Sequence, residues 1–395
     1  MLIKELLDSR AKVTSFTRPR RFGKSLLSST LRSYFEGKKE LFNGLAIGNM
    51  EKEWIERPVL HFDLSTFKNC ELSLFPEKFD MQLRRFEQRF GIENTKKSAG
   101  NRLTQLIEQA EAKTGRKVVV IIDEYDAPLL DVLHEEKKLE TVRTIMQEFY
   151  APIKANSSHI HFAFITGITK FSQLSIFSTI NNLANISMDP EFSTICGITK
   201  EELDTILKED IALLASRNHV SFERMRELLR ENYDGYHFSR EGEDIFNPYS
   251  LMRSFAAGFI DNYWYASGTS THLIHQLQHF HTDVTILDDI FAFSSSFDRP
   301  TEKMSDALPL LYQSGYLTIK AFDEEVGVYT LDLPNQEIRT GLFENLLPNY
   351  LAFGQSGAVT VAYLSRYIRS NNIDGALRLL QDFLGTVPYC NVKNH

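Results

Sequence analysis

The sequence predicts an α/β protein built on a parallel β-sheet with helices on both faces. Two observations lead to this fold class. The run VVVIID at residues 118–123 has no polar residue before its final aspartate, as expected of a strand buried on both faces of a parallel sheet. Strand candidates and helical stretches also alternate through the first 190 residues, and parallel strands need long crossovers, usually helices, between them.

Five strands are expected in this first part of the chain, which we interpret as a core domain at residues 1–190. They are short runs rich in apolar and β-branched residues, at residues 12–17, 58–65, 117–123, 159–167 and 182–189. Apolar residues at helical spacing predict helices between them, at residues 24–35, 75–91, 100–113 and 137–155.

The pattern becomes mainly helical after residue 190. Thr199, with Glu202 three residues later, forms a capping box, which predicts a helix over residues 199–215. Helical sequence continues to about residue 290. Residues 191–302 are therefore interpreted as a helical lid domain.

Residues 303–350 follow the order helix, strand, turn, strand, helix, which is typical of a winged-helix-like module. The first helix, KMSDALPLLYQSG, is not basic. A protein-interaction or autoinhibitory role is therefore favoured over DNA binding, which stays open. A further helical stretch predicts a helical tail at residues 351–395.

Composition excludes several classes of protein. No apolar run approaches the ~20 residues that span a bilayer, and the start, MLIKELLDSRAK, lacks the features of a secretory signal. The three cysteines are odd in number and widely spread, which argues against a disulfide framework and fits a reducing cytoplasm. The net charge of −8 argues against a generally basic, nucleic-acid-binding surface.

The stretch FTRPRRFGKSLL at residues 16–27 lies between the first strand and the first helix. A loop in this position points backbone N–H groups and the positive end of the helix dipole at an anion. It ends as a phosphate-binding loop ends: Lys24 would reach the β- and γ-phosphates, and the Ser25 hydroxyl would hold Mg²⁺. Such a loop usually opens with glycine where Arg18 stands, so the residues alone leave open a helix start with a solvated basic turn.

Two acids end the most apolar strand. Asp123 would hold the magnesium shell, and Glu124 would orient and deprotonate the attacking water, with Asp126 as the next candidate base. Acids also end many strands for structural reasons. Thr166 ends the following strand, where it would contact the water or the γ-phosphate, or serve as an ordinary strand-end residue.

Three arginines crowd the loop: Arg18, Arg20 and Arg21. They would supply the positive charge that backbone N–H groups supply in a glycine-rich loop, or one would act as an arginine finger. The alternative is a surface cluster of ion pairs.

Together these features resemble the AAA-ATPase-like proteins, in which an ATPase domain precedes a PD-(D/E)XK-type nuclease domain. The resemblance covers essentially the whole chain. It rests on motifs in the same order: RPRRFGKSL, IIDEYDAPL, TGITKFSQLSIFSTINNL, CGITKEEL, NYDGYHFS, NPYSL, YWYASGT, LLYQSGYLTIK and LPNQEIR. In that family the loop is typically RPRRFGKS, so the arginine at position 18 is the family's own form.

The resemblance implies a P-loop NTPase fold of the ASCE type and a site for ATP and Mg²⁺. It carries over Gly23, Lys24 and Ser25 as phosphate-binding residues and Asp123 and Glu124 as the acidic pair. With the positions argued above, we expect catalysis from Glu124, Asp123 and Thr166 and metal binding by Ser25 and Asp123. We expect nucleotide binding along the whole loop: Arg18, Pro19, Arg20, Arg21, Phe22, Gly23, Lys24, Ser25 and Leu26.

The chain departs from the family pattern at both ends. Family members usually begin with a segment containing Tyr-Val-Asp-Lys-Thr, and they continue into the nuclease. The residues after LPNQEIR contain no Asp followed by Glu-x-Lys. We therefore expect the tail to lead to a nuclease-like domain that is absent, and no nuclease activity from this chain.

We expect a cytoplasmic module that binds ATP, hydrolyses it and controls an attached or partner nuclease or effector. Two alternatives stay open: a nucleotide-binding switch with little hydrolysis, and an interaction scaffold with a relic site. Direct nucleic-acid binding and the oligomeric state are not decided by the sequence.

Overall fold

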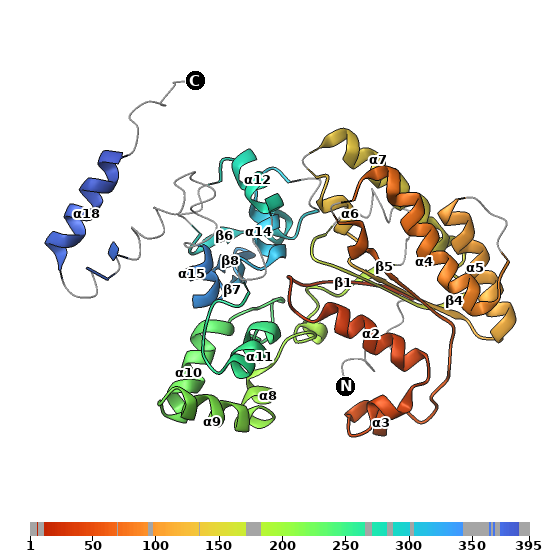
Figure 1. The fold of residues 1–395 in the computed structure, drawn as a ribbon, viewed down its shortest axis with the longest axis horizontal. Coiled ribbons are helices and arrows are strands. Elements are labelled where there is room, and N and C mark those ends of the chain that lie inside the picture. The colour runs from red at the N-terminus through yellow and green to blue at the C-terminus, as the bar shows by residue number, and fades with distance from the viewer. Residues whose placement is uncertain are drawn as a thin grey trace.

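The computed structural model describes residue 6 and residues 12–68, 70–93, 98–133, 135–170, 183–264, 271–282, 287–300, 304–342, 363–364, 366–367 and 372–386. Within these residues, a large sheet with helices is followed by further helices and a small second sheet (Figure 1). Most of the expected tail lies outside the described residues, which include α18 (Ile373–Thr386).

The large sheet is parallel throughout, with the strand order β2-β3-β4-β1-β5. All five expected strands are present, as β1 (Val13–Thr17), β2 (Val59–Asp63), β3 (Val118–Asp123), β4 (Ile160–Gly167) and β5 (Leu183–Asn185). β5 is shorter than the expected strand at residues 182–189. Because β4 lies between β1 and β3, the three strands that carry the predicted site residues are neighbours.

Helices cover both faces of this sheet (Figure 1). α2 (Lys24–Phe35) lies on one face, and α4 (Phe75–Phe90), α5 (Ala99–Thr114) and α7 (Glu136–Ala155) lie on the other. In β3, Val120 and Ile122 belong to the core beneath the three helices, whereas Ile121 packs with Leu31 of α2. Burial on both faces explains the unbroken apolar run of this strand.

Short helices complete this region. They are η1 (Lys39–Phe42), α3 (Ala46–Met50), η2 (Leu64–Phe67), η3 (Leu72–Leu74), α6 (Ala127–Leu130) and η4 (Pro190–Phe192).

Two further hydrophobic clusters organise the rest of the described chain. One is shared by α8 (Lys200–Thr205), α9 (Lys208–Arg217), α10 (Phe222–Tyr233) and α11 (Pro248–Ala257). The other is shared by α12 (Thr271–His279), β6 (Ile290–Ala292), α13 (Ser294–Phe297), α14 (Leu308–Ser314), β7 (Thr318–Asp323), β8 (Val328–Asp332) and α15 (Gln336–Gly341). We call this second set of elements the C-terminal module.

The expected order helix, strand, strand, helix is present as α14, β7, β8 and α15. The small sheet has a third strand, β6, which pairs antiparallel with β8. This strand was not predicted from the sequence. Residues 343–350 of the predicted module lie outside the described residues, and the likeness to a winged helix stays a prediction.

The prediction of one helix over residues 199–215 is wrong. The capping box of Thr199 and Glu202 is present and opens α8. The helix ends after Thr205, and the Leu207 N–H bonds to the Glu202 carbonyl, five residues back. A new helix, α9, then begins at Lys208.

None of the helices in the described part of the chain has the length and apolar character that a bilayer crossing requires. Cys70 and Cys196, both described, are free thiols.

Candidate nucleotide-binding site

Three of the predicted site segments meet at the carboxyl edge of the sheet. Thr17, the last residue of β1, pairs with Gly167 at the end of β4, and Ile165 of β4 pairs with Ile122 of β3. The loop after β1, the acids at the end of β3 and Thr166 therefore lie along one stretch of the same edge. In open α/β sheets, ligands bind in the crevice outside the carboxyl ends of the strands.

The loop closes around the ammonium group of Lys24. Lys24 is the first residue of α2, and its Nζ donates to the carbonyl oxygens of Arg18 at 2.9 Å and Pro19 at 2.8 Å. Its side chain is buried, and burial lowers its pKa, while the carboxylates of Asp126 and Glu124 oppose that shift. Because it is buried, Lys24 itself is not a solvated lysine at a helix start.

Gly23 makes the junction between the loop and α2. Its φ of 75° lies in the left-handed region, which favours glycine. An added Cβ would meet no atom within 4 Å. The glycine is therefore required by the backbone conformation and not by crowding.

Ser25 and Asp123 lie within hydrogen-bonding reach of each other. Asp123 is 4% exposed. Burial raises the pKa of its carboxyl, and a hydrogen bond from the Ser25 side chain opposes that rise. Proteins usually give Mg²⁺ only one or two oxygen ligands, and phosphates and water supply its other ligands. A hydroxyl and a carboxylate are ligands of this kind. The donor set therefore fits the expected cation.

Glu124 leaves the strand in an unusual conformation. Its φ of 51° is positive, and its amide donates to Asp123 Oδ1 at 3.1 Å. Its carboxylate forms an ion pair with Lys68, which follows η2. This ion pair of Lys68 was not predicted from the sequence, because Lys68 belongs to no recognisable motif.

Asp126 has a positioning function in this structure. It is buried, and its Oδ2 accepts from the amides of Ile168 at 2.9 Å and Thr169 at 2.6 Å and from the Thr169 hydroxyl at 2.8 Å. These bonds tie the segment after β3 to the segment after β4. A carboxylate engaged in this way is poorly placed to act as the base.

Thr166 is fully buried in β4, the strand between β1 and β3. Its backbone carbonyl accepts from the Tyr125 amide at 3.0 Å. Among the described residues, its Oγ1 has no hydrogen-bond partner. A buried hydroxyl without a partner is uncommon, and it is consistent with a group that bonds to a ligand or water.

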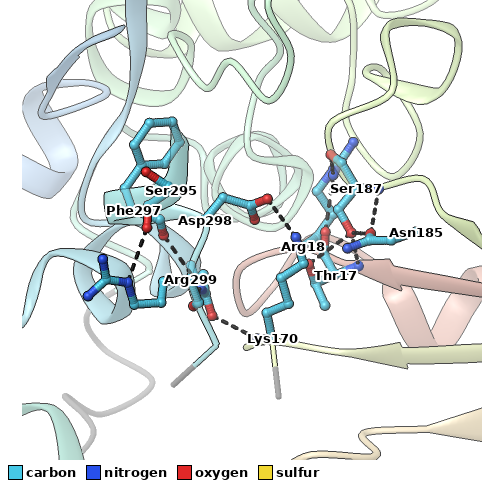
Figure 2. Close-up of polar contacts among 10 residues, drawn as sticks. Thr17, Arg18, Lys170, Asn185, Ser187, Ser295, Phe297, Asp298 and Arg299 are labelled. Atoms are coloured by element: carbon cyan, nitrogen blue, oxygen red, sulfur yellow. Dashed lines mark hydrogen bonds and ion pairs between the residues drawn. The ribbon is translucent and has the colours of Figure 1, made fainter. Parts of the chain in front are cut away.

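Arg18 is placed differently from the expectation that it supplies charge to phosphate. Its guanidinium donates to the carbonyls of Thr17 at 3.1 Å and Ser187 at 2.7 Å (Figure 2). It also donates to the carbonyls of Phe192 at 3.0 Å and Ser193 at 3.1 Å. It also lies over the rings of Phe16 and Phe238, 4.5 and 4.2 Å from their centroids. Burial lowers its pKa to about 10. In this arrangement Arg18 anchors the loop to the segment after β5. Because it is buried, Arg18 also does not belong to a surface cluster of ion pairs.

The other loop residues divide into exposed and buried groups. Arg20, Arg21, Ser25 and Leu26 are exposed, and the Arg21 guanidinium lies 4.4 Å from the Tyr249 ring centroid. Phe22 is fully buried in the hydrophobic cluster of the C-terminal module.

The segment after β4 also contacts this module. The Lys170 amide donates to Gln313 Oε1 at 2.7 Å, and its ammonium pairs with Asp298 at 2.5 Å (Figure 2). Burial raises the pKa of Asp298. Asp298, Thr17 and Pro19 all line a cavity of about 20 Å³, which has room for about one water. The phosphate-loop edge of the sheet is thus in contact with the C-terminal module.

Comparison with known proteins agrees with this geometry. Residues 1–177 match a family described as "Predicted AAA-ATPase". The chain is also 31% identical over 383 residues to a protein of Azotobacter chroococcum mcd 1 described as "Uncharacterized protein in vnfD 5'region", with 96% of this chain and 72% of that protein covered. This chain belongs to the predicted AAA-ATPase family. Membership is consistent with nucleotide binding at the edge of the sheet described above.

Proposed function

We propose that the protein binds ATP with Mg²⁺ at the carboxyl edge of the sheet and hydrolyses it. One observation carries this proposal: Lys24, the Ser25–Asp123 pair and Glu124 meet at the ends of neighbouring elements. Phosphate sites need a cation, backbone N–H donors at a helix start and ligands for the metal. The other loop residues predicted from the sequence, from Arg18 to Leu26, would shape this site.

Each residue would have a separate task. Lys24 would turn its ammonium from the loop carbonyls to the phosphates. Ser25 and Asp123 would hold Mg²⁺, which when bound neutralises charge on the phosphate oxygens. Glu124 would accept a proton from the attacking water, and the Thr166 hydroxyl would orient that water or the terminal phosphate.

A nucleotide-binding switch with little hydrolysis is the second candidate, and the ion pair between Glu124 and Lys68 favours it. While its carboxylate is paired with Lys68, Glu124 is not free to contact the attacking water. Hydrolysis would require Glu124 to leave Lys68, so turnover would depend on a change in this part of the site.

The biological role proposed for this module is control of a nuclease or another effector. It rests on the resemblance to proteins in which the ATPase precedes a nuclease. The three widely spread cysteines support a cytoplasmic location as part of the same proposal. The C-terminal module, winged-helix-like in the order of its elements, would transmit the state of the site.

The substitution Glu124→Gln tests hydrolysis. Glutamine keeps the shape of the side chain but cannot accept the proton, so we expect ATP to bind about as tightly as in the parent while turnover falls by a factor on the order of 10² or more. Phosphate release and calorimetric binding are measured on the same samples, with the exposed Glu108→Gln as the matched control.

The outcomes separate the candidates. Equal turnover in parent and Glu124→Gln would show that Glu124 is not the base. If both proteins bind ATP and neither releases phosphate above background, the switch is the correct function.

A further inference from the structure

The phosphate loop is held from outside the large sheet by aromatic residues. The Phe22 ring packs edge-to-face against both Tyr236 and Phe238, with ring centroids 4.8 and 5.4 Å away. Pro19 lies so close to Gly315, the residue after α14, that a Cβ there would come within 2.6 Å of Pro19 Cβ. The loop is therefore packed against the distant part of the chain over several of its residues.

Trp264 adds a directed polar contact to this packing. Its indole Nε1 donates to the Arg20 carbonyl at 3.3 Å. Arg20 follows Arg18 and Pro19, whose carbonyls are held by the Lys24 ammonium. Lys24 and Trp264 thus bind carbonyls of three successive loop residues.

Trp264 is itself fixed by a buried carboxylate. The side chain of Trp264 is 7% exposed and meets the Tyr316 ring edge-to-face at 5.1 Å. Its backbone N–H donates to Glu337 Oε1 at 2.8 Å. Glu337 belongs to α15 and is fully buried. A continuous set of hydrogen bonds therefore runs from α15 through Trp264 to the loop.

We propose that Trp264 is a positioning residue for the phosphate loop, and that it couples occupancy of the loop to the packing of the C-terminal module. The inference rests on the proposed function, because it requires nucleotide at the loop. To reach phosphate, Lys24 must release at least part of its bonds to the carbonyls of Arg18 and Pro19. The loop backbone next to these carbonyls would then move, and the adjacent Arg20 carbonyl is bonded to Trp264. Coupling of this kind is reciprocal: an indole that holds the loop favours nucleotide, and nucleotide favours the bound indole.

The protein contains two tryptophans, which makes the proposal measurable by fluorescence. Trp54 lies elsewhere, against the rings of Tyr34 and Phe42. Trp54→Phe leaves Trp264 as the sole indole emitter. We expect its emission to change saturably on titration with Mg-ATP, with the dissociation constant that calorimetry gives for the same variant. In the matched variant Trp264→Phe, emission from Trp54 should stay constant.

Trp264→Phe also tests the hydrogen bond, since it keeps an aromatic ring and removes the donor. We expect Mg-ATP affinity to fall about fivefold, the scale of one neutral hydrogen bond, and we expect Trp54→Phe to bind as the parent does. Thermal unfolding of both variants shows whether the loss follows from a general loss of stability.

Two results would overturn the inference in different ways. If calorimetry shows ATP binding, but Trp264 emission is constant and Trp264→Phe binds as tightly as Trp54→Phe, then Trp264 does not position the loop, and the proposed function survives. If the parent does not bind Mg-ATP by calorimetry, the proposed function fails and the coupling fails with it.

Discussion

Arg18 and Lys24 show how much a buried cation depends on its acceptors. Arg18 is 2% exposed and Lys24 7% exposed. Arg18 bonds to four backbone carbonyls and Lys24 to two. A planar guanidinium can donate in several directions at once, whereas an ammonium is a compact point charge. The two residues therefore cannot exchange roles, although both are basic and only six positions apart.

The substitution Arg18→Lys tests this distinction. A lysine at position 18 cannot serve the carbonyls of Ser187, Phe192 and Ser193 together, so buried acceptors lose their donors. We expect unfolding free energy to fall by roughly 2–4 kcal/mol, because each buried carbonyl left without a donor costs about 1–3 kcal/mol, as measured by chemical denaturation. Arg20→Lys, at the exposed arginine of the same loop, is the control and should change stability by less than about 0.5 kcal/mol. Equal effects of the two substitutions would contradict the anchoring role of Arg18.

At the scale of elements, the strands of the large sheet could be predicted from the sequence because their environment is simple. β3 is buried on both faces, so an unbroken run of apolar side chains is enough to predict it. α2 was predicted at its observed bounds, Lys24–Phe35, because glycine precedes it and apolar residues recur at helical spacing. The break between α8 and α9 was not predicted, because Thr199 through Ala215 is continuously helix-compatible and tertiary packing decides where the axis turns.

The two ends of α2 allow a matched test of the loop. Gly23 precedes the helix and Gly37 follows its C-cap, with φ of 75° and 70°. Alanine at either position should cost about 1 kcal/mol of unfolding free energy because of the left-handed backbone. We expect only Gly23→Ala to weaken Mg-ATP binding as well, because it strains the loop. If Gly37→Ala weakens binding equally, the effect comes from general destabilisation and the loop assignment loses support.

At the scale of the whole molecule, the candidate site has a part that sequence could predict and a part that it could not. The positions of Lys24, Ser25, Asp123 and Glu124 could be predicted, because the first two open a recognisable helix and the last two lie at the end of a recognisable strand. The contacts of Phe22 with Tyr236 and Phe238 join segments more than 200 residues apart in the chain. No local sequence pattern predicts a contact between residues so far apart in the chain. The ion pair of Glu124 with Lys68 was missed for the same reason.

Phe22 links the predicted phosphate loop to the C-terminal module. The loop that would bind phosphate begins on the large sheet and contributes a side chain to the hydrophobic cluster of the C-terminal module. A change in the loop therefore cannot be confined to the sheet region. Under the proposed function, nucleotide binding would reach the C-terminal module through this contact of Phe22.

The most direct test of the central claim is calorimetric titration of Mg-ATP into the parent and into Lys24→Met. Methionine keeps much of the buried stem and removes the ammonium. Because the Arg18 and Pro19 carbonyls lose their donor, stability should fall by about 1–2 kcal/mol, so binding is measured well below the unfolding temperature. Lys12→Met, at the exposed lysine before β1 that bonds to the Ser157 carbonyl, is the control. We predict saturable binding to the parent and to Lys12→Met, and affinity weakened about 100-fold or more in folded Lys24→Met, the scale of lost charge-assisted hydrogen bonds. Binding of Mg-ATP to folded Lys24→Met with the affinity of the parent would contradict the account.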